Sequence, residues 1–105
     1  MMSCYFQYDE RLGIKIPKLE EEWDSYSSDV RASVLFQWEQ IRGAIPDRIL
    51  KLEAVIILKQ NQLDHEDDFL TSCQLNSEIA DLASTINDLH LWFRVNQELE
   101  SKVHH

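Results

Sequence analysis

The chain has 105 residues, about the size of one small domain, and 44% of them are hydrophobic, enough for a packed core. Its two glycines and two prolines are too few for the many turns of a β-sandwich or barrel, or for a glycine-rich phosphate loop. Ten basic and nineteen acidic residues give a net charge of −9, which repels phosphates, so we expect neither nucleic acid nor a membrane as partner.

Residues 1–17 are predicted to form an extended arm. Residues 3–8 (SCYFQY) and 12–16 (LGIKI) are short runs rich in aromatic and β-branched side chains, the composition of β-strands, and the second run ends at Pro17. The two runs fit one small hairpin.

A short acidic helix is predicted over residues 18–27. Pro17 suits the first turn of a helix, where a missing N–H costs nothing, and the glutamates at 20–22 would lie near the positive end of the helix dipole. Ser27, Ser28 and Asp29 then provide a break and an N-cap for the next helix.

The first long helix is predicted over residues 29–63, where apolar residues recur on alternating three- and four-residue steps. Arg42 and Lys59 must fill the two places at which the pattern lacks an apolar residue. Pro46 removes one backbone hydrogen bond and clashes with the preceding turn, so we expect a kink near 43–46. The apolar positions of this seam are Leu35, Trp38, Ile45, Ile49, Leu52, Ile56 and Leu63.

A polar turn at 62–68 precedes a second long helix, predicted over residues 68–100. Asp67 or Asp68 can cap this helix, because a helix N-terminus favours carboxylates. The same apolar spacing returns at Leu75, Ile79, Leu82, Ile86, Leu89 and Phe93.

The two seams come into register if the chain folds back at 65–66, which supports a hairpin of helices. We therefore predict an all-α fold in one domain, residues 1–105. It is a long, coiled-coil-like antiparallel helical hairpin with the arm and the short helix packed at its open end. The expected contacts are Ile56 with Leu75, Leu52 with Ile79, Ile49 with Leu82, Ile45 with Ile86, and Trp38 with Phe93.

Aromatic side chains are concentrated at the open end of this hairpin. We expect them to form an ordinary core rather than a ligand-binding aromatic box. They are Phe36, Trp38, Trp92 and Phe93 on the helices, and Tyr5, Phe6, Tyr8, Trp23 and Tyr26 nearer the N-terminus.

The turn end of the hairpin has no comparable cover, because two helices packed on one stripe cannot bury all of its apolar residues. A second copy could cover them by closing a four-helix bundle, so we expect a homodimer. The predicted interaction residues are Val55, Ile57, Leu58, Leu63, Phe69 and Leu70.

No residue pattern predicts a catalytic, cofactor-binding or metal site. The turn at Asp64, His65, Glu66, Asp67 and Asp68 lacks the alternating ligands and the glycine of an EF-hand, and we interpret it as a solvated, helix-capping turn. Cys73 is expected to be a packed thiol, and His90 a partly buried neutral histidine.

The start of the second long helix resembles the UVR motif, a short helical hairpin through which bacterial repair and protease-adaptor proteins contact other proteins. The matching positions are Phe69, Ser72, Cys73, Leu75, Glu78, Ile79 and Leu82. Asn76 and Ser77 depart from the Arg-Asp that is usual there, so the resemblance implies only a hairpin tip used for association.

No stretch approaches the ~18 apolar residues of a membrane helix, and residues 1–5 lack the features of a signal peptide. We expect a cytoplasmic protein in which Cys4 and Cys73 are reduced, with a disulfide between them as the alternative.

The function expected from this sequence is that of a non-enzymatic adaptor or small regulatory protein that docks through helix faces. Its expected partners are a second copy of itself and another protein with a basic or apolar helix-binding surface. The basic residues Arg31, Arg42, Arg48 and Lys51 should pair with Glu78, Asp81 and Asp88 across the hairpin. The alternatives are an acidic mimic of nucleic acid and a metal- or thiol-dependent sensor.

Overall fold

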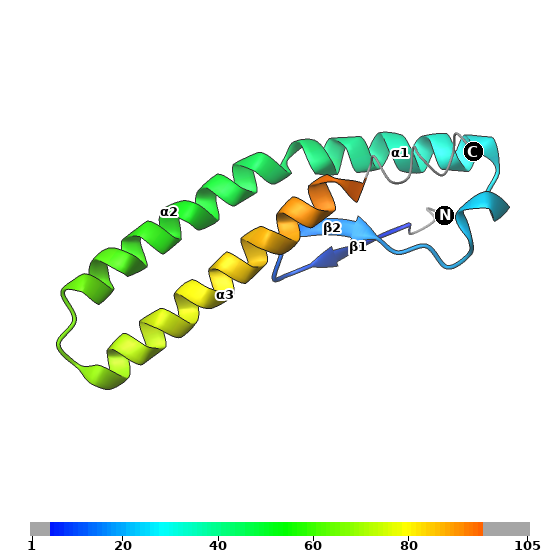
Figure 1. Cartoon of the computed structure of the whole chain (residues 1–105). Helices are drawn as coiled ribbons and strands as arrows, with labels where there is room; N and C mark the ends of the chain where they lie inside the picture. Colours follow the sequence, from blue (N-terminus) through cyan, green and yellow to red (C-terminus); the bar gives the residue numbers. More distant parts are fainter. Residues whose placement is uncertain (1–4, 96–105) are drawn as a thin grey trace.

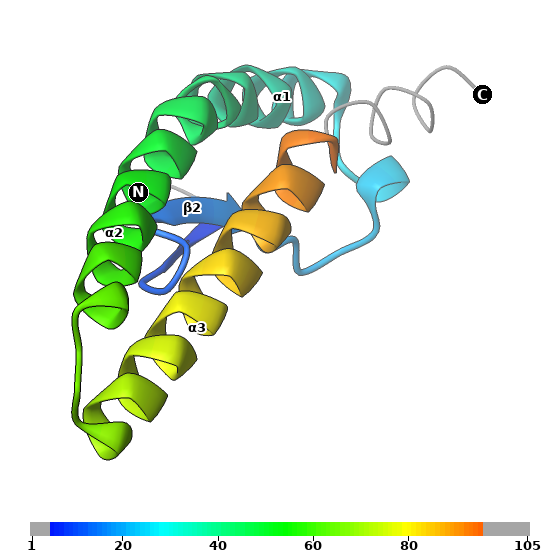
Figure 2. The ribbon, with the colours of Figure 1, turned by 60° about the vertical axis from the view of Figure 1, so that its left-hand side comes forward.

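The computed structural model describes residues 5–95 and is dominated by an antiparallel pair of long helices (Figure 1). Helix α2 spans Ile45–Asp64, helix α3 spans Phe69–Phe93, and the two run side by side from the turn that joins them. Helix α1, Ser28–Gly43, extends beyond the pair from the N-terminal end of α2 and lies at an angle to it (Figures 1 and 2). The predicted helical hairpin is therefore present, in a molecule that measures 59 × 26 × 18 Å.

The spacing of buried residues explains why α2 and α3 pair. Ile45, Ile49 and Leu52 are buried on α2, and Leu75 and Leu89 on α3, at the predicted steps. Arg42 and Lys59 do take the two missing places and face α3. The Arg42 guanidinium lies 4.7 Å from the centre of the Phe93 ring, and Lys59 Nζ lies 2.8 Å from Glu78 Oε1.

The turn between the helices comprises residues 65–68, so its centre lies one residue later than predicted. Lys59 and Arg42 also contact residues further along α3 than the predicted register places opposite them. Their long side chains extend along the helix to Glu78 and Phe93. In α1 the buried residues are Val34 and Trp38, whereas Leu35, which the predicted seam included, is only partly buried.

The helix break is at the predicted place. Helix α1 ends at Gly43, and Pro46 occupies the first turn of α2, where its missing N–H leaves no acceptor unsatisfied within that helix. At the break itself, the Ala44 amide donates a hydrogen bond to the Ile41 carbonyl at 3.1 Å. One residue thus separates the two helices, and their axes meet at a bend there (Figures 1 and 2).

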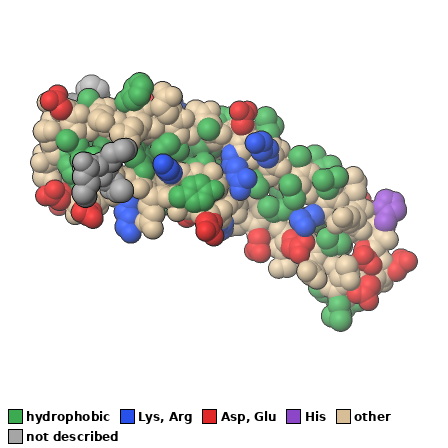
Figure 3. Space-filling view, turned by 180° about the vertical axis from the view of Figure 1, so that it is seen from behind, with side chains coloured by type: hydrophobic (Ala, Val, Ile, Leu, Met, Phe, Trp, Pro, Cys, Tyr) green, Lys and Arg blue, Asp and Glu red, His purple; other side chains and the backbone are tan. Residues whose placement is uncertain are grey.

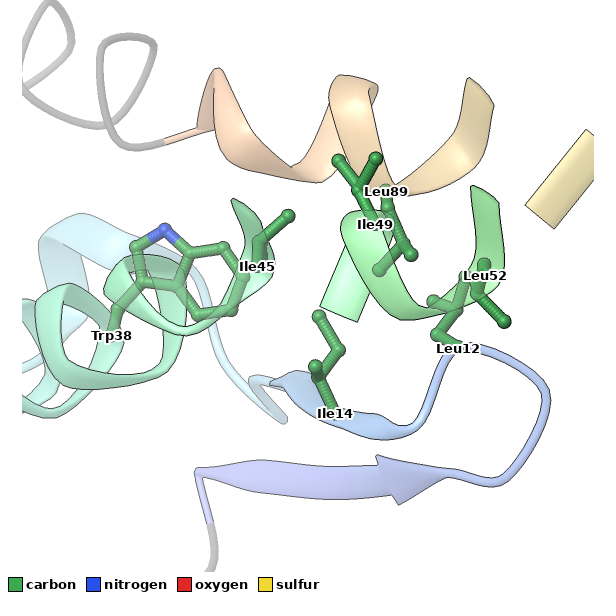
Figure 4. Packing of buried hydrophobic residues seen from close by; sticks show 7 residues of the cluster. All are labelled: Leu12, Ile14, Trp38, Ile45, Ile49, Leu52 and Leu89. Atoms are coloured by element: carbon green, nitrogen blue, oxygen red, sulfur yellow. The ribbon is translucent and has the colours of Figure 1, made fainter. Parts of the chain in front are cut away.

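The N-terminal arm is a β-hairpin, so the fold is mostly helical rather than purely helical. Strand β1, Phe6–Asp9, pairs antiparallel with β2, Ile14–Pro17. Leu12 and Ile14 point from this hairpin into the main core, as Figure 4 shows, so the arm forms part of the core instead of only closing its end. The residues they join are Trp38, Ile45, Ile49, Leu52 and Leu89.

The predicted helix over 18–27 is wrong in extent. Pro17 belongs to β2, opposite Phe6, and only one 3-10 turn, Trp23–Ser25, follows (η1). Such a short segment has few hydrogen bonds to offset the entropy of starting a helix, and burial of Trp23 holds it in place instead.

The aromatic core forms with fewer members than predicted. Trp38 is fully buried, stacks on Phe6 at 6.4 Å between ring centres, and meets Trp92 edge-on at 5.9 Å. Phe36 and Tyr8, in contrast, are 67% and 57% exposed and lie outside this cluster. Periodicity places Phe36 on the outer side of α1, two residues from Trp38.

Candidate protein-interaction surface

One broad face of the α2–α3 pair is covered by the β-hairpin, but only in the half that is remote from the turn (Figures 1 and 2). Arg48 Nε on α2 donates to the Leu12 carbonyl at 3.0 Å. Arg11 donates to Asp88 Oδ2 at 2.7 Å and to Ser84 Oγ at 3.0 Å on α3. The hairpin therefore bridges both helices and leaves the turn half of the pair without cover.

That turn half exposes large apolar side chains. Ile57 is 58% exposed, Leu58 63%, Phe69 76% and Leu70 75%; Val55 is also exposed, whereas Leu63 is partly buried. In the space-filling view from behind, hydrophobic side chains lie on the surface of the half that ends in the turn (Figure 3). We refer to Val55, Leu58 and Leu70 as the turn-half patch.

Ile57 lies on a different side of α2 from Val55, because residues two positions apart in an α-helix are separated by about 200° around its axis. It borders a hollow of ≈ 420 Å³ that is lined by Glu53, Ile56, Ile57, Ala83 and Ile86. A second hollow of ≈ 360 Å³ shares Glu53 with the first and is lined by Pro46, Ile49, Leu50, Glu53, His90 and Phe93. We call the two adjoining hollows the α2–α3 groove.

The groove was not predicted, because periodicity assigns Ile49, Ile56, Ile86 and Phe93 to the seam and cannot show that their edges stay accessible. The structure marks the groove more clearly through Leu50 and His90, which line it and are exposed. His90 borders the groove and is exposed, so the prediction of a partly buried histidine is wrong.

The acidic turn serves to cap α3. Asp68 accepts hydrogen bonds from the Thr71 amide at 2.9 Å and the Thr71 hydroxyl at 2.8 Å, which lower its pKa. His65 Nδ1 lies 2.8 Å from the Asn61 carbonyl oxygen. Within residues 5–95, no three His, Cys, Asp or Glu side chains are grouped so that they could hold a metal ion.

Cys73 is an exposed free thiol in the second turn of α3, so the prediction of a packed thiol is wrong. The helix places it about 200° from the buried Leu75. Cys4, the other member of the alternative disulfide, lies outside the described residues.

Two carboxylates of α3, those of Glu78 and Asp88, pair with cations other than the predicted ones. Glu78 pairs with Lys59, and Asp88 with Arg11. Arg42 pairs with Glu39 at 2.6 Å, Arg31 donates to the Tyr26 carbonyl at 3.0 Å, and Arg48 is engaged by the β-hairpin. The hydrogen bond from Lys59 and a weaker one from Gln74 lower the pKa of Glu78. These ion pairs therefore connect elements of the fold: Lys59 and Glu78 join α2 to α3, and Arg11 and Asp88 join the β-hairpin to α3.

Compared with family models, with curated proteins and with solved structures, the chain matches none. The resemblance of residues 69–82 to the UVR motif therefore carries no family assignment. None of the helices between residues 5 and 95 combines the length and apolarity needed to cross a bilayer.

Proposed function

We propose that the protein is a non-enzymatic interaction module that associates with a second copy of itself through the turn-half patch. The observation that carries this proposal is the exposure of Leu58 and Leu70, each more than three-fifths accessible on a part of the helix pair that no described element covers. Each such side chain would contribute about 1.5–3 kcal/mol if an interface buried it completely.

The local charge supports a second copy as the occupant, although the chain carries −9 overall. Residues 54–58 of α2 and residues 69–77 of α3 contain no charged side chain. Two copies that meet over these segments bury apolar surface without opposing like charges, and two helix pairs packed in this way form a four-helix bundle.

Substitution of Leu58 tests the proposal. Leu58→Asp should convert a dimer into a monomer, since it places a charge in the apolar interface, and light scattering coupled to size-exclusion chromatography measures the mass. Because Leu58 is exposed, far-ultraviolet circular dichroism should remain that of the wild type.

Asn61→Asp is the matched control, because it adds the same charge one helical turn away without removing apolar surface. It should remain dimeric. A wild-type protein that is monomeric at micromolar concentration would refute the proposed dimer.

A further inference from the structure

The α2–α3 groove lies on a different side of the helix pair from Val55 and Leu58, and its chemistry calls for a different occupant. We propose that it binds one amphipathic helix of another protein, with apolar residues facing the groove and a central Arg or Lys that pairs with Glu53. This inference is independent of self-association through the turn-half patch.

The shape of the groove fits a helix. Its lining runs along α2 from Pro46 to Ile57, twelve residues that rise about 17 Å along the helix axis, which matches three turns of a docked helix. Ala83 contributes only a methyl group on the α3 side, so that a partner backbone can approach closely. A third helix in this position would bury the edges of Ile56, Ile86 and Phe93, which the fold leaves only partly buried.

Glu53 determines the polarity of the occupant. It borders both hollows and is the one acidic residue among the side chains that line them. Within residues 5–95, no hydrogen bond or ion pair engages its carboxylate, whereas Glu39, Glu78 and Asp88 all have cationic partners. A partner that covers the groove with apolar residues alone would desolvate an unpaired carboxylate, and a cation on the partner removes that cost.

A second copy does not meet this requirement. In a two-fold symmetric dimer built on the groove, the same surface faces itself, so the Glu53 side chains of the two copies approach each other. The groove lining contains no Lys or Arg to separate them. Charge therefore favours a basic helix from a different protein.

Charge-swap binding tests the inference, with the full-length protein and two labelled peptides followed by fluorescence anisotropy. Both peptides are Ala- and Gln-based helices of about four turns. Each carries leucines on alternating three- and four-residue steps, with the central leucine replaced by arginine in one and by glutamate in the other.

The wild type should bind the arginine peptide about fivefold more tightly than the glutamate peptide, the effect of one partly exposed ion pair. Glu53→Lys should reverse this preference. Asp81→Lys is the matched control, because Asp81 is exposed on α3 but does not line the groove, and it should leave the preference for arginine intact.

Ala83→Phe should fill the groove and weaken binding of the arginine peptide without loss of helical circular dichroism. Equal affinity for the two peptides, binding of neither, or an equal effect of Glu53→Lys and Asp81→Lys would overturn the inference. A dimer that Ala83→Phe alone converts into a monomer would overturn it too, because a second copy would then occupy the groove.

Discussion

At the scale of single residues, the tightest constraint lies where the β-hairpin meets α2. Gly13 has φ = +75°, a conformation that residues with a side chain rarely adopt. A Cβ added there would lie 2.6 Å from Arg48 Nε, the atom that donates to the Leu12 carbonyl. The glycine therefore permits both the turn and the hydrogen bond that fixes the hairpin to the helix.

The two glycines of the chain make a matched pair of substitutions. Gly13→Ala should lower the free energy of unfolding by about 1–2 kcal/mol from backbone strain alone, with a further loss as Arg48 is displaced. Gly43→Ala, where an added Cβ meets no atom within 4 Å, should leave stability unchanged or raise it by up to about 1 kcal/mol. Urea unfolding followed by circular dichroism measures both, and equal effects would contradict this account.

At the scale of elements, the start of α3 depends on one carboxylate. Asp68→Ala removes the acceptor for the Thr71 amide and should lower the melting temperature by a few degrees. Asp67→Ala is the control, because the adjacent exposed carboxylate makes no capping hydrogen bond in the described structure. A loss of equal size in both variants would show that charge near the helix end, rather than the cap, is responsible.

The same cap predicts a dependence on pH. The Thr71 amide and, second, its hydroxyl hold the pKa of Asp68 below its ordinary value of 3.8. A carboxyl with a lower pKa in the folded state contributes stability above its unfolded pKa and loses it as the pH falls through the folded pKa. Asp68→Asn keeps a capping oxygen, so it should match the wild type near neutral pH and lose less stability in urea at about pH 3.

The elements that the sequence predicts best are those with a local cause. The helices and their break follow from 3.6-residue periodicity and from Pro46, and the cap at Asp68 follows from its position before an apolar run. The β-hairpin fits the predicted arm, but its place in the core was not predicted, since nothing local to Leu12 or Ile14 shows that these residues join the core cluster of the helices. The groove likewise depends on how two distant segments sit together, which periodicity does not describe.

At the scale of the whole molecule, shape limits stability. The radius of gyration is 18.1 Å, whereas a compact domain of about 100 residues has one near ~13 Å. Among residues 5–95, the large core cluster lies where the β-hairpin meets the helices, and the turn half of the pair contributes little beyond Leu75. An elongated monomer of this kind buries a small share of its apolar surface, so association has much to add.

If two copies meet at the turn-half patch, folding and association are linked, and stability must rise with protein concentration. A tenfold increase should stabilise the folded dimer by about 1.4 kcal/mol, visible as a higher melting temperature in circular dichroism. Leu58→Asp should melt at a lower temperature that does not vary with concentration, whereas Asn61→Asp should follow the wild type. A wild-type melting temperature that stays constant over a hundredfold range of concentration, about 2.7 kcal/mol of expected change, would show that the turn half is stable without a partner copy.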